Sequence, residues 1–301
     1  MKLLAGFDIG GSKIAGGVFS PAGELLAETV EPTPGDYAAF LQTCRNILER
    51  LESATGTTVQ VGVGIAGRVS GGDLRDSPPS MPFLRGKSLR RDLAASLNSE
   101  VRIANDANCM AFAEAIDGAG EGFKSIVGLI IGTGVGSGFV REGKIEEGVN
   151  GMAGEIGHLP LPFRDESDAP PVQCGCGQKG CIEQSISGGA LARLYFLLTG
   201  KEADARTIAI KARTGDREAL SVLDRYFETV AKAMVAVLHS FDPEAIVVSG
   251  GMNDLPGFYD EVPKRWGKYA YIARPETRLL PAKHGPMSGM RGASWLWRGS
   301  A

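Results

Sequence analysis

The sequence lacks the features that would place this protein in a membrane, on a nucleic acid or outside the cell. No apolar run reaches the length needed to cross a bilayer. The opening Met-Lys-Leu-Leu-Ala-Gly-Phe meets Asp8 too early to form the apolar core of a secretory signal. A formal net charge of −3, with 22% charged residues, provides no basic excess. We therefore expect a cytoplasmic, globular protein with neither a nucleic-acid nor a membrane partner.

Cysteine is also scarce, but the few cysteines are clustered. Of five in 301 residues, three fall within one short stretch as Cys174, Cys176 and Cys181. Clustered cysteines in a cytosolic protein favour a metal over disulfides. With His158 they form a complete tetrahedral Zn²⁺ set that leaves no position for an activated water, so we expect structural zinc. The alternative is a group of ordinary buried thiols near an unrelated histidine.

Two carboxylates accompany the predicted zinc ligands. Glu155 precedes His158 by three residues, and Glu183 follows Cys181 by two. Because metal ligation fixes the backbone of its ligands, it would also fix these neighbouring acids. The segment predicts a polar pocket ordered by zinc.

Glycine is abundant, and its pattern repeats within the chain. The 42 glycines are about twice the usual share. Residues 4–18 and 126–140 each read as strand, glycine turn and strand, with Gly10 aligned to Gly132 and Gly16 to Gly138. The repeat predicts a duplicated α/β fold. We place one lobe at 1–118 plus 286–301 and the other, with the zinc motif, at 119–285.

The two glycine hairpins are candidates for phosphate binding, because backbone N–H groups in such turns bind anions. Facing each other between two lobes, they would hold the phosphates of a nucleotide. Asp8 would orient hydrated Mg²⁺ beside these phosphates. The alternative is a pair of unrelated hairpins that need glycine only for tight turns. The candidate nucleotide-binding residues of the hairpins are Asp8, Gly10, Gly11, Ser12, Lys13, Gly132, Thr133 and Gly134. We assign Lys13 no catalytic role.

Hydrophobic periodicity predicts alternating helices and strands, and hence mixed sheets with a parallel core. The predicted strands after the first hairpin are 24–30, 59–65, 101–103 and 245–248. The predicted helices are 37–51, 89–97, 107–116, 189–198, 216–240 and 290–297.

Two common nucleotide motifs are excluded. Gly62, Gly64 and Gly67 match the spacing of the dinucleotide fingerprint, but Arg68 to Asp73 reads as a turn where that motif needs a helix. A Gly-x-x-x-x-Gly-Lys-Ser/Thr loop is absent from the sequence. Phosphate binding is therefore assigned to the paired hairpins.

Asp106 is the candidate general base. It follows Asn105 at a predicted strand-to-helix junction, where ligands of open α/β sheets gather. An aspartate that accepts the proton of a substrate hydroxyl is the usual base in phosphoryl transfer. The alternative role is helix capping, for which Asn and Asp are both favoured.

Taken together, these segments resemble the ROK family of sugar kinases, within the actin/hexokinase-like, ribonuclease H-like superfamily of two-lobed ATPases. The similar passages are Asp8-Ile-Gly-Gly-Ser-Lys, Asn105-Asp106-Ala-Asn108, Gly154-Glu155-Ile-Gly-His158, Cys174-Gly-Cys176-Gly and Gly180-Cys181-Ile-Glu183. The resemblance extends over essentially the whole chain.

This resemblance implies transfer of the γ-phosphate of ATP to the 6-hydroxyl of a hexose, with Mg²⁺, structural Zn²⁺ and a homodimer. N-acetyl-D-glucosamine is the expected sugar, with glucose, fructose and N-acetylmannosamine as alternatives. Asn105, Asp106, Glu155, His158 and Glu183 would hold ring hydroxyls, with His158 using its second ring nitrogen. Gly250 and Gly251 would contact adenosine.

The chain departs from the family pattern at Ser80, where many relatives have Asn, and at Arg68, which follows Gly67. Gly67, Arg68 and Ser80 are all expected to contact the sugar.

A sugar-responsive repressor is a second hypothesis, but only seven residues precede Asp8, too few for a DNA-binding helix-turn-helix. A catalytically dead sugar sensor is a third hypothesis, disfavoured because Asp106 and both hairpins are present.

Overall fold

The computed structural model describes residues 2–298, which divide into two compact units. The first unit combines 1–122, 138–153 and 283–301, and the second combines 123–137 and 154–282. The chain therefore crosses between the units more than once. The lobe boundaries predicted from the sequence stay a proposal.

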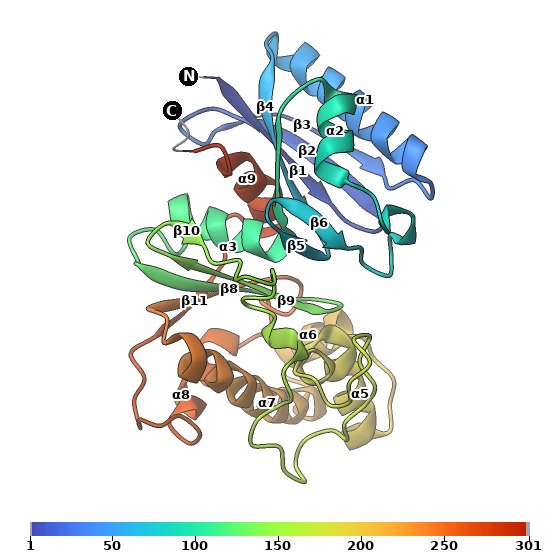
Figure 1. Cartoon of the computed structure of the whole chain (residues 1–301). Helices are drawn as coiled ribbons and strands as arrows, with labels where there is room; N and C mark the ends of the chain where they lie inside the picture. Colours follow the sequence, from blue (N-terminus) through green and yellow to red (C-terminus); the bar gives the residue numbers. More distant parts are fainter. Residues whose placement is uncertain (1, 299–301) are drawn as a thin grey trace. The chain divides into compact units, whose positions relative to one another are not determined.

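Two five-stranded sheets share one topology (Figure 1). The first has the order β3-β2-β1-β4-β7 and the second β10-β9-β8-β11-β12. In each, two parallel strands extend an antiparallel hairpin, which confirms the predicted mixed sheets and the internal repeat. The strands are β1 (Leu3–Ile9), β2 (Lys13–Phe19), β3 (Leu25–Pro32), β4 (Val59–Ile65), β7 (Val101–Asn105), β8 (Ser125–Ile131), β9 (Val135–Arg141), β10 (Lys144–Ile145), β11 (Ala245–Ser249) and β12 (Arg278–Pro281).

Helices cover both faces of the first sheet (Figure 1). Gly16 on β2 faces Ile47 of α1, whereas the next residue, Gly17, faces Met290 of α9. Successive strand residues point to opposite faces, so α1 and α9 lie on opposite sides. The helices of this unit are α1 (Tyr37–Thr55), α2 (Leu89–Leu97), α3 (Asp106–Asp117) and α9 (Ser288–Trp295), with a short 3-10 helix η1 (Pro82–Leu84) and, before α9, η3 (Gly285–Met287).

The second unit is built around α7 (Arg217–Phe241), the longest helix of the described chain. Its Lys232, with no exposed side-chain surface, donates to Asp165 and Asp168 at 2.8 Å each. These bonds attach the loop that precedes the cysteine cluster to the helix. The other helices here are α4 (Glu183–Ile186), α5 (Gly188–Thr199), α6 (Ala205–Arg213) and α8 (Phe258–Trp266), with the 3-10 helix η2 (Ile156–His158).

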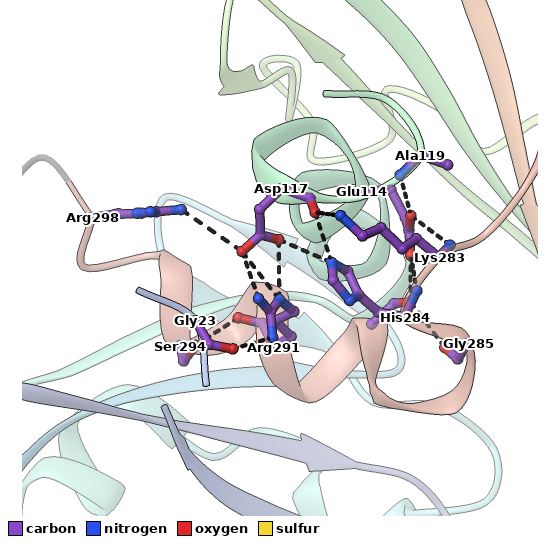
Figure 2. A network of polar contacts seen from close by, with 11 residues as sticks. Gly23, Glu114, Asp117, Ala119, Lys283, His284, Gly285, Arg291, Ser294 and Arg298 are labelled. Atoms are coloured by element: carbon purple, nitrogen blue, oxygen red, sulfur yellow. Dashed lines mark hydrogen bonds and ion pairs between the residues drawn. The ribbon is translucent and has the colours of Figure 1, made fainter. Parts of the chain in front are cut away.

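A polar network fastens the C-terminal segment to α3 (Figure 2). The carboxylate of Glu114, with no exposed surface, accepts from the backbone N–H groups of Ala119, Lys283 and His284 and from the Ser288 hydroxyl, at 2.8 to 3.0 Å. One helical turn later, the Asp117 carboxylate accepts from the Arg291 guanidinium and lies 3.0 Å from His284 Nε2. The network holds together the two parts of the first unit that adjoin the chain crossings near 122 and 283.

The predicted helices and strands are confirmed, with one correction and several elements that were missed. Residues 68–73, predicted as a turn, form the hairpin β5 (Arg68–Ser70) and β6 (Asp73–Asp76), in which only Gly71 and Gly72 turn. Helices α4, α6 and α8 and strands β10 and β12 were not predicted. Among residues 2–298, no helix combines the length and the apolar character that crossing a bilayer requires.

Candidate functional site

The four predicted zinc ligands lie together in the second unit. Their ligand atoms are all within 4.8 Å of one another. The Sγ of Cys174 is 3.7 Å from Nδ1 of His158, and the Sγ of Cys176 is 3.6 Å from that of Cys181. Tetrahedral zinc, with bonds of about 2.0 to 2.3 Å, separates its ligand atoms by about 3.5 to 3.8 Å. The donor set and its spacing therefore fit a closed structural zinc site.

The thiols of this cluster differ in acidity. Burial raises the pKa of Cys174, and it raises that of Cys181 to about 12. A hydrogen bond from the backbone of Gln178 lowers the pKa of Cys176. Because zinc binds thiolates, loading the cluster would release protons from the two buried thiols.

The predicted sugar-binding acids of this unit flank the cluster. The Nε2 atom of His158 lies 3.9 Å from Oε2 of Glu155. Glu183 Oε1 is 3.5 Å from Cys174 Sγ, and its Oε2 accepts from the N–H of Val135 at 3.2 Å. The Nδ1 atom of His158 thus faces the cysteines while Nε2 faces a carboxylate.

The predicted nucleotide-binding residues of the second unit lie where two parallel strands end. Gly132, Thr133 and Gly134 follow β8, and the N–H of Gly132 donates to the carbonyl of Gly134 at 2.9 Å. Gly250 and Gly251 follow β11, which runs parallel to β8. The next residue donates from its N–H to the carbonyl of Ile131, the last residue of β8, at 3.0 Å. The structure brings these two glycine turns together.

In the first unit, Asp8 and Asp106 are neighbours because β1, β4 and β7 run parallel. Register pairs Asp8 with Gly64 and Gly64 with Ala104, two residues before Asp106. Burial, reinforced by the charge of Asp106 and opposed by Lys13, raises the pKa of Asp8 to about 6. After Asp8 the chain turns through Gly10, Gly11 and Ser12, closed by the N–H of Gly10 donating to the carbonyl of Lys13 at 3.0 Å.

Asn105, rather than Asp106, is the N-cap of α3. Its Oδ1 accepts from the N–H groups of Ala107 and Asn108 at 2.9 and 3.1 Å. Asp106 is the first helical residue, and its Oδ1 accepts from the N–H of Ala107 at 2.9 Å. Burial raises the pKa of Asp106, although hydrogen bonds to its carboxylate oppose the shift. Capping therefore accounts for Asn105 better than for Asp106.

Gly67, Arg68 and Ser80 occupy the same unit. Asn105 Nδ2 donates to the carbonyl of Gly67 at 3.1 Å. The side chain of Ser80 lies against the glycine turn at Gly11. The Arg68 guanidinium is already bonded within the protein, to the carboxylate of Asp76 at 2.5 Å and to the carbonyl of Asn150 at 2.8 Å.

One residue to which the sequence assigned no role lies beside Asp8. A Cβ added at Gly289, the second residue of α9, would lie 3.0 Å from the Asp8 carboxylate. A larger side chain would therefore crowd the space next to this acid. The only local signal is the glycine itself, in a helix where glycine is unfavourable.

The predicted site residues are divided between the two units. The first holds Asp8, Gly10, Gly11, Ser12, Lys13, Gly67, Arg68, Ser80, Asn105 and Asp106, and the second holds Gly132, Thr133, Gly134, Glu155, His158, Cys174, Cys176, Cys181, Glu183, Gly250 and Gly251.

Comparison with known proteins identifies the family. The sequence profile described as the ROK family matches residues 4–300. The N-acetyl-D-glucosamine kinase of Vibrio vulnificus is 36% identical over 296 residues, 97% of this chain and 98% of that protein. The crystal structure of a ROK hexokinase from Thermus thermophilus matches with a TM-score of 0.83 at 30% identity, over 97% of this chain and 96% of its own. A ROK glucokinase from Streptomyces griseus, solved with glucose and AMPPNP, matches with a TM-score of 0.80 at 28% identity, over 98% of both chains. The chain belongs to the ROK family.

Proposed function

We propose that this chain, an ATP-dependent sugar kinase of the ROK family, transfers the γ-phosphoryl group of ATP to the 6-hydroxyl of N-acetyl-D-glucosamine. The observation that carries the substrate assignment is the 36% identity, over 97% of the chain, to a protein named N-acetyl-D-glucosamine kinase. Glucose, fructose and N-acetylmannosamine are the alternative sugars. The enzyme would work in the cytoplasm as a homodimer.

In the proposed reaction Asp106 removes the proton of the sugar 6-hydroxyl as its oxygen attacks the γ-phosphorus and ADP leaves. A raised pKa suits this role, because an acid closer to neutrality is a stronger proton acceptor. Asn105, Glu155, His158 and Glu183 would hold the sugar hydroxyls. The glycine turns at 10–11, 132–134 and 250–251 would bind ATP.

Two metals belong to this proposal. Mg²⁺, when bound, neutralises phosphate charge, and the Asp8 carboxylate would orient its hydration shell. Asp8 fits, since a buried carboxylate with a raised pKa gains from a nearby cation. Zinc would be held by the Cys174, Cys176, Cys181 and His158 cluster, leaving His158 Nε2 for the sugar.

The base assignment is tested with Asp106→Asn. We expect kcat to fall by on the order of 10² to 10⁴ while ATP affinity stays largely unchanged. Asp204→Asn is the matched control, since Asp204 also sits at a helix N-terminus and accepts from Thr207 at 2.7 Å. Near-normal turnover of Asp106→Asn would remove the base assignment.

The substrate assignment is tested by ADP release across N-acetylglucosamine, glucose, fructose, mannose and N-acetylmannosamine. N-acetylglucosamine should give the highest kcat/KM, and its 6-deoxy analogue should give none. A higher value for another sugar would replace the substrate, and phosphorylation of the 6-deoxy analogue would refute the 6-hydroxyl.

A further inference from the structure

Helix α7 carries a lysine whose charge is buried inside the second unit. The side chain of Lys232 has no exposed surface, and its Nζ atom donates to Oδ2 of Asp165 and to Oδ2 of Asp168 at 2.8 Å each. Asp168 is buried as well, whereas Asp165 is half-exposed; residues 165–168 are here called the anchored loop. Lysine is rarely buried unless it is paired, and a buried pair often stabilises a fold less than apolar packing would. The conformation that this pair fixes explains it better than the stability that it adds.

Two other residues of α7 bond to the same loop. Arg225 and Thr229 precede Lys232 by seven and three residues, so the three side chains lie on one face of the helix. The Arg225 guanidinium donates to the carbonyl of Ser167 at 2.9 Å, and the Thr229 hydroxyl donates to Oδ1 of Asp168 at 3.0 Å. This helix face therefore holds both the backbone and the side chains of the anchored loop.

The anchored loop lies in the middle of the connection between two members of the cysteine and histidine cluster. It begins seven residues after His158 and ends six residues before Cys174. A flexible connection of this length loses conformational freedom when a metal brings its two ends together. A connection that is already held at its middle loses less, so less of the metal's binding free energy is spent on ordering the chain. The bonds from α7 thus favour a cluster that is arranged before the metal binds.

We propose that Lys232 is a positioning residue for the cysteine cluster: by holding the anchored loop on α7, it keeps His158 and Cys174 at the spacing that zinc requires. This inference rests on the zinc site of the proposed function and goes beyond it, because Lys232 bonds to the loop and is not itself a ligand. Zinc in turn would fix His158, whose second ring nitrogen is proposed to hold the sugar. Loss of the anchor should therefore weaken zinc binding, and sugar binding as a consequence.

The test measures the zinc affinity of the full-length protein by competition with a chromogenic chelator. The double variant Lys232→Met/Asp168→Asn removes the buried cation together with its buried partner, so that no unpaired charge is left inside the fold. We expect its zinc affinity to fall by roughly 10-fold or more. Asp165→Asn removes one charged bond at a half-exposed position and leaves the buried pair in place, so it should lower the affinity by a smaller factor.

Arg265→Met is the matched control. Arg265 is also a largely buried cation that bonds to two carboxylates of α7, those of Asp224 and Glu228, but it does so from α8. This variant should lower Tm and leave the zinc affinity unchanged. In kinetics, the double variant should show a raised KM for N-acetylglucosamine, with KM for ATP and kcat near the wild-type values, and excess zinc should restore the sugar KM.

The outcomes separate this inference from the function on which it rests. Wild-type zinc affinity in the double variant, or in Asp165→Asn if the double variant does not fold, would overturn the inference alone. An equal loss of zinc affinity in Arg265→Met would also overturn it, because the effect would then be general destabilisation. A wild-type protein that binds no zinc would instead overturn the metal assignment of the proposed function, and this inference with it.

Discussion

Replacing Asp8 by asparagine should stabilise the ligand-free protein while abolishing catalysis. Asp8 has a pKa of about 6 in the folded protein against an ordinary value of 3.8. The folded state therefore holds this proton more tightly than the unfolded chain. The free energy of unfolding therefore falls as the pH rises from about 4 through about 6, because the Asp8 carboxyl group must then become charged while it is buried.

A pKa displacement of this size corresponds to about 3 kcal/mol above pH 7. Asparagine removes the charge but leaves a buried polar amide, so we expect a net gain of about 1 to 3 kcal/mol. At about 2 to 4 °C per kcal/mol for a domain of 150 to 250 residues, Tm should rise by several degrees at pH 8. The gain should largely disappear at pH 4, where the folded wild type keeps this proton and the unfolded chain is close to its ordinary pKa of 3.8.

The assay is thermal unfolding of wild type and Asp8→Asn from pH 4 to pH 8, without ligands. Asp92→Asn is a control of opposite sign, because hydrogen bonds from Tyr37 and Arg91 lower the pKa of Asp92. Its carboxylate stabilises the fold above the unfolded pKa and loses that effect as the pH falls through the folded pKa. A destabilised Asp8→Asn at pH 8, or a difference in Tm independent of pH, would refute the reasoning.

Two further predictions concern structural groups. Glu114→Gln should lower Tm at neutral pH by the equivalent of about 3 kcal/mol, since an amide has one acceptor oxygen for the four donors that meet this carboxylate. The exposed Glu121→Gln is the control and should change Tm little. An unchanged Tm for Glu114→Gln would contradict the role of this network. Cys176→Ala should abolish stoichiometric zinc in elemental analysis and raise KM for the sugar. Cys44→Ala is the control, because Cys44 lies outside the cluster and its loss should leave the metal bound. A wild-type protein without zinc would contradict the metal assignment.

The sequence was most informative where the signal is local. The strands of both hairpins and the ends of α2 and β4 follow from the spacing of apolar residues and glycines. Helix α8 was missed because Pro263 lies inside it, where proline normally ends a helix. Strand β12 was missed because it is only four residues long, half-exposed and ends at a proline.

Contacts between distant segments could not be predicted from a single sequence. The cluster of three cysteines and His158 was found because its cysteines share one short stretch. The bond from Arg68 to Asn150 joins residues 82 positions apart, and Glu114 accepts from a backbone N–H 169 positions away. The sequence around Arg68 or Glu114 contains no local pattern that identifies such a partner.

The pKa shifts of the carboxyl groups divide the aspartates into two groups. Wherever the described chain lowers the pKa of an aspartate, as at Asp92, Asp117 and Asp165, bonds from cationic or hydroxyl groups stabilise the charged form. Asp8 and Asp106 differ, since burial dominates and their pKa values are raised. Asp8 lies near the end of β1 and Asp106 directly after β7, close enough for the charge of Asp106 to raise the pKa of Asp8, and perturbed acids of this kind gather at functional sites. The stability gain expected for Asp8→Asn would therefore measure the cost of keeping a site ready for a cation and a proton.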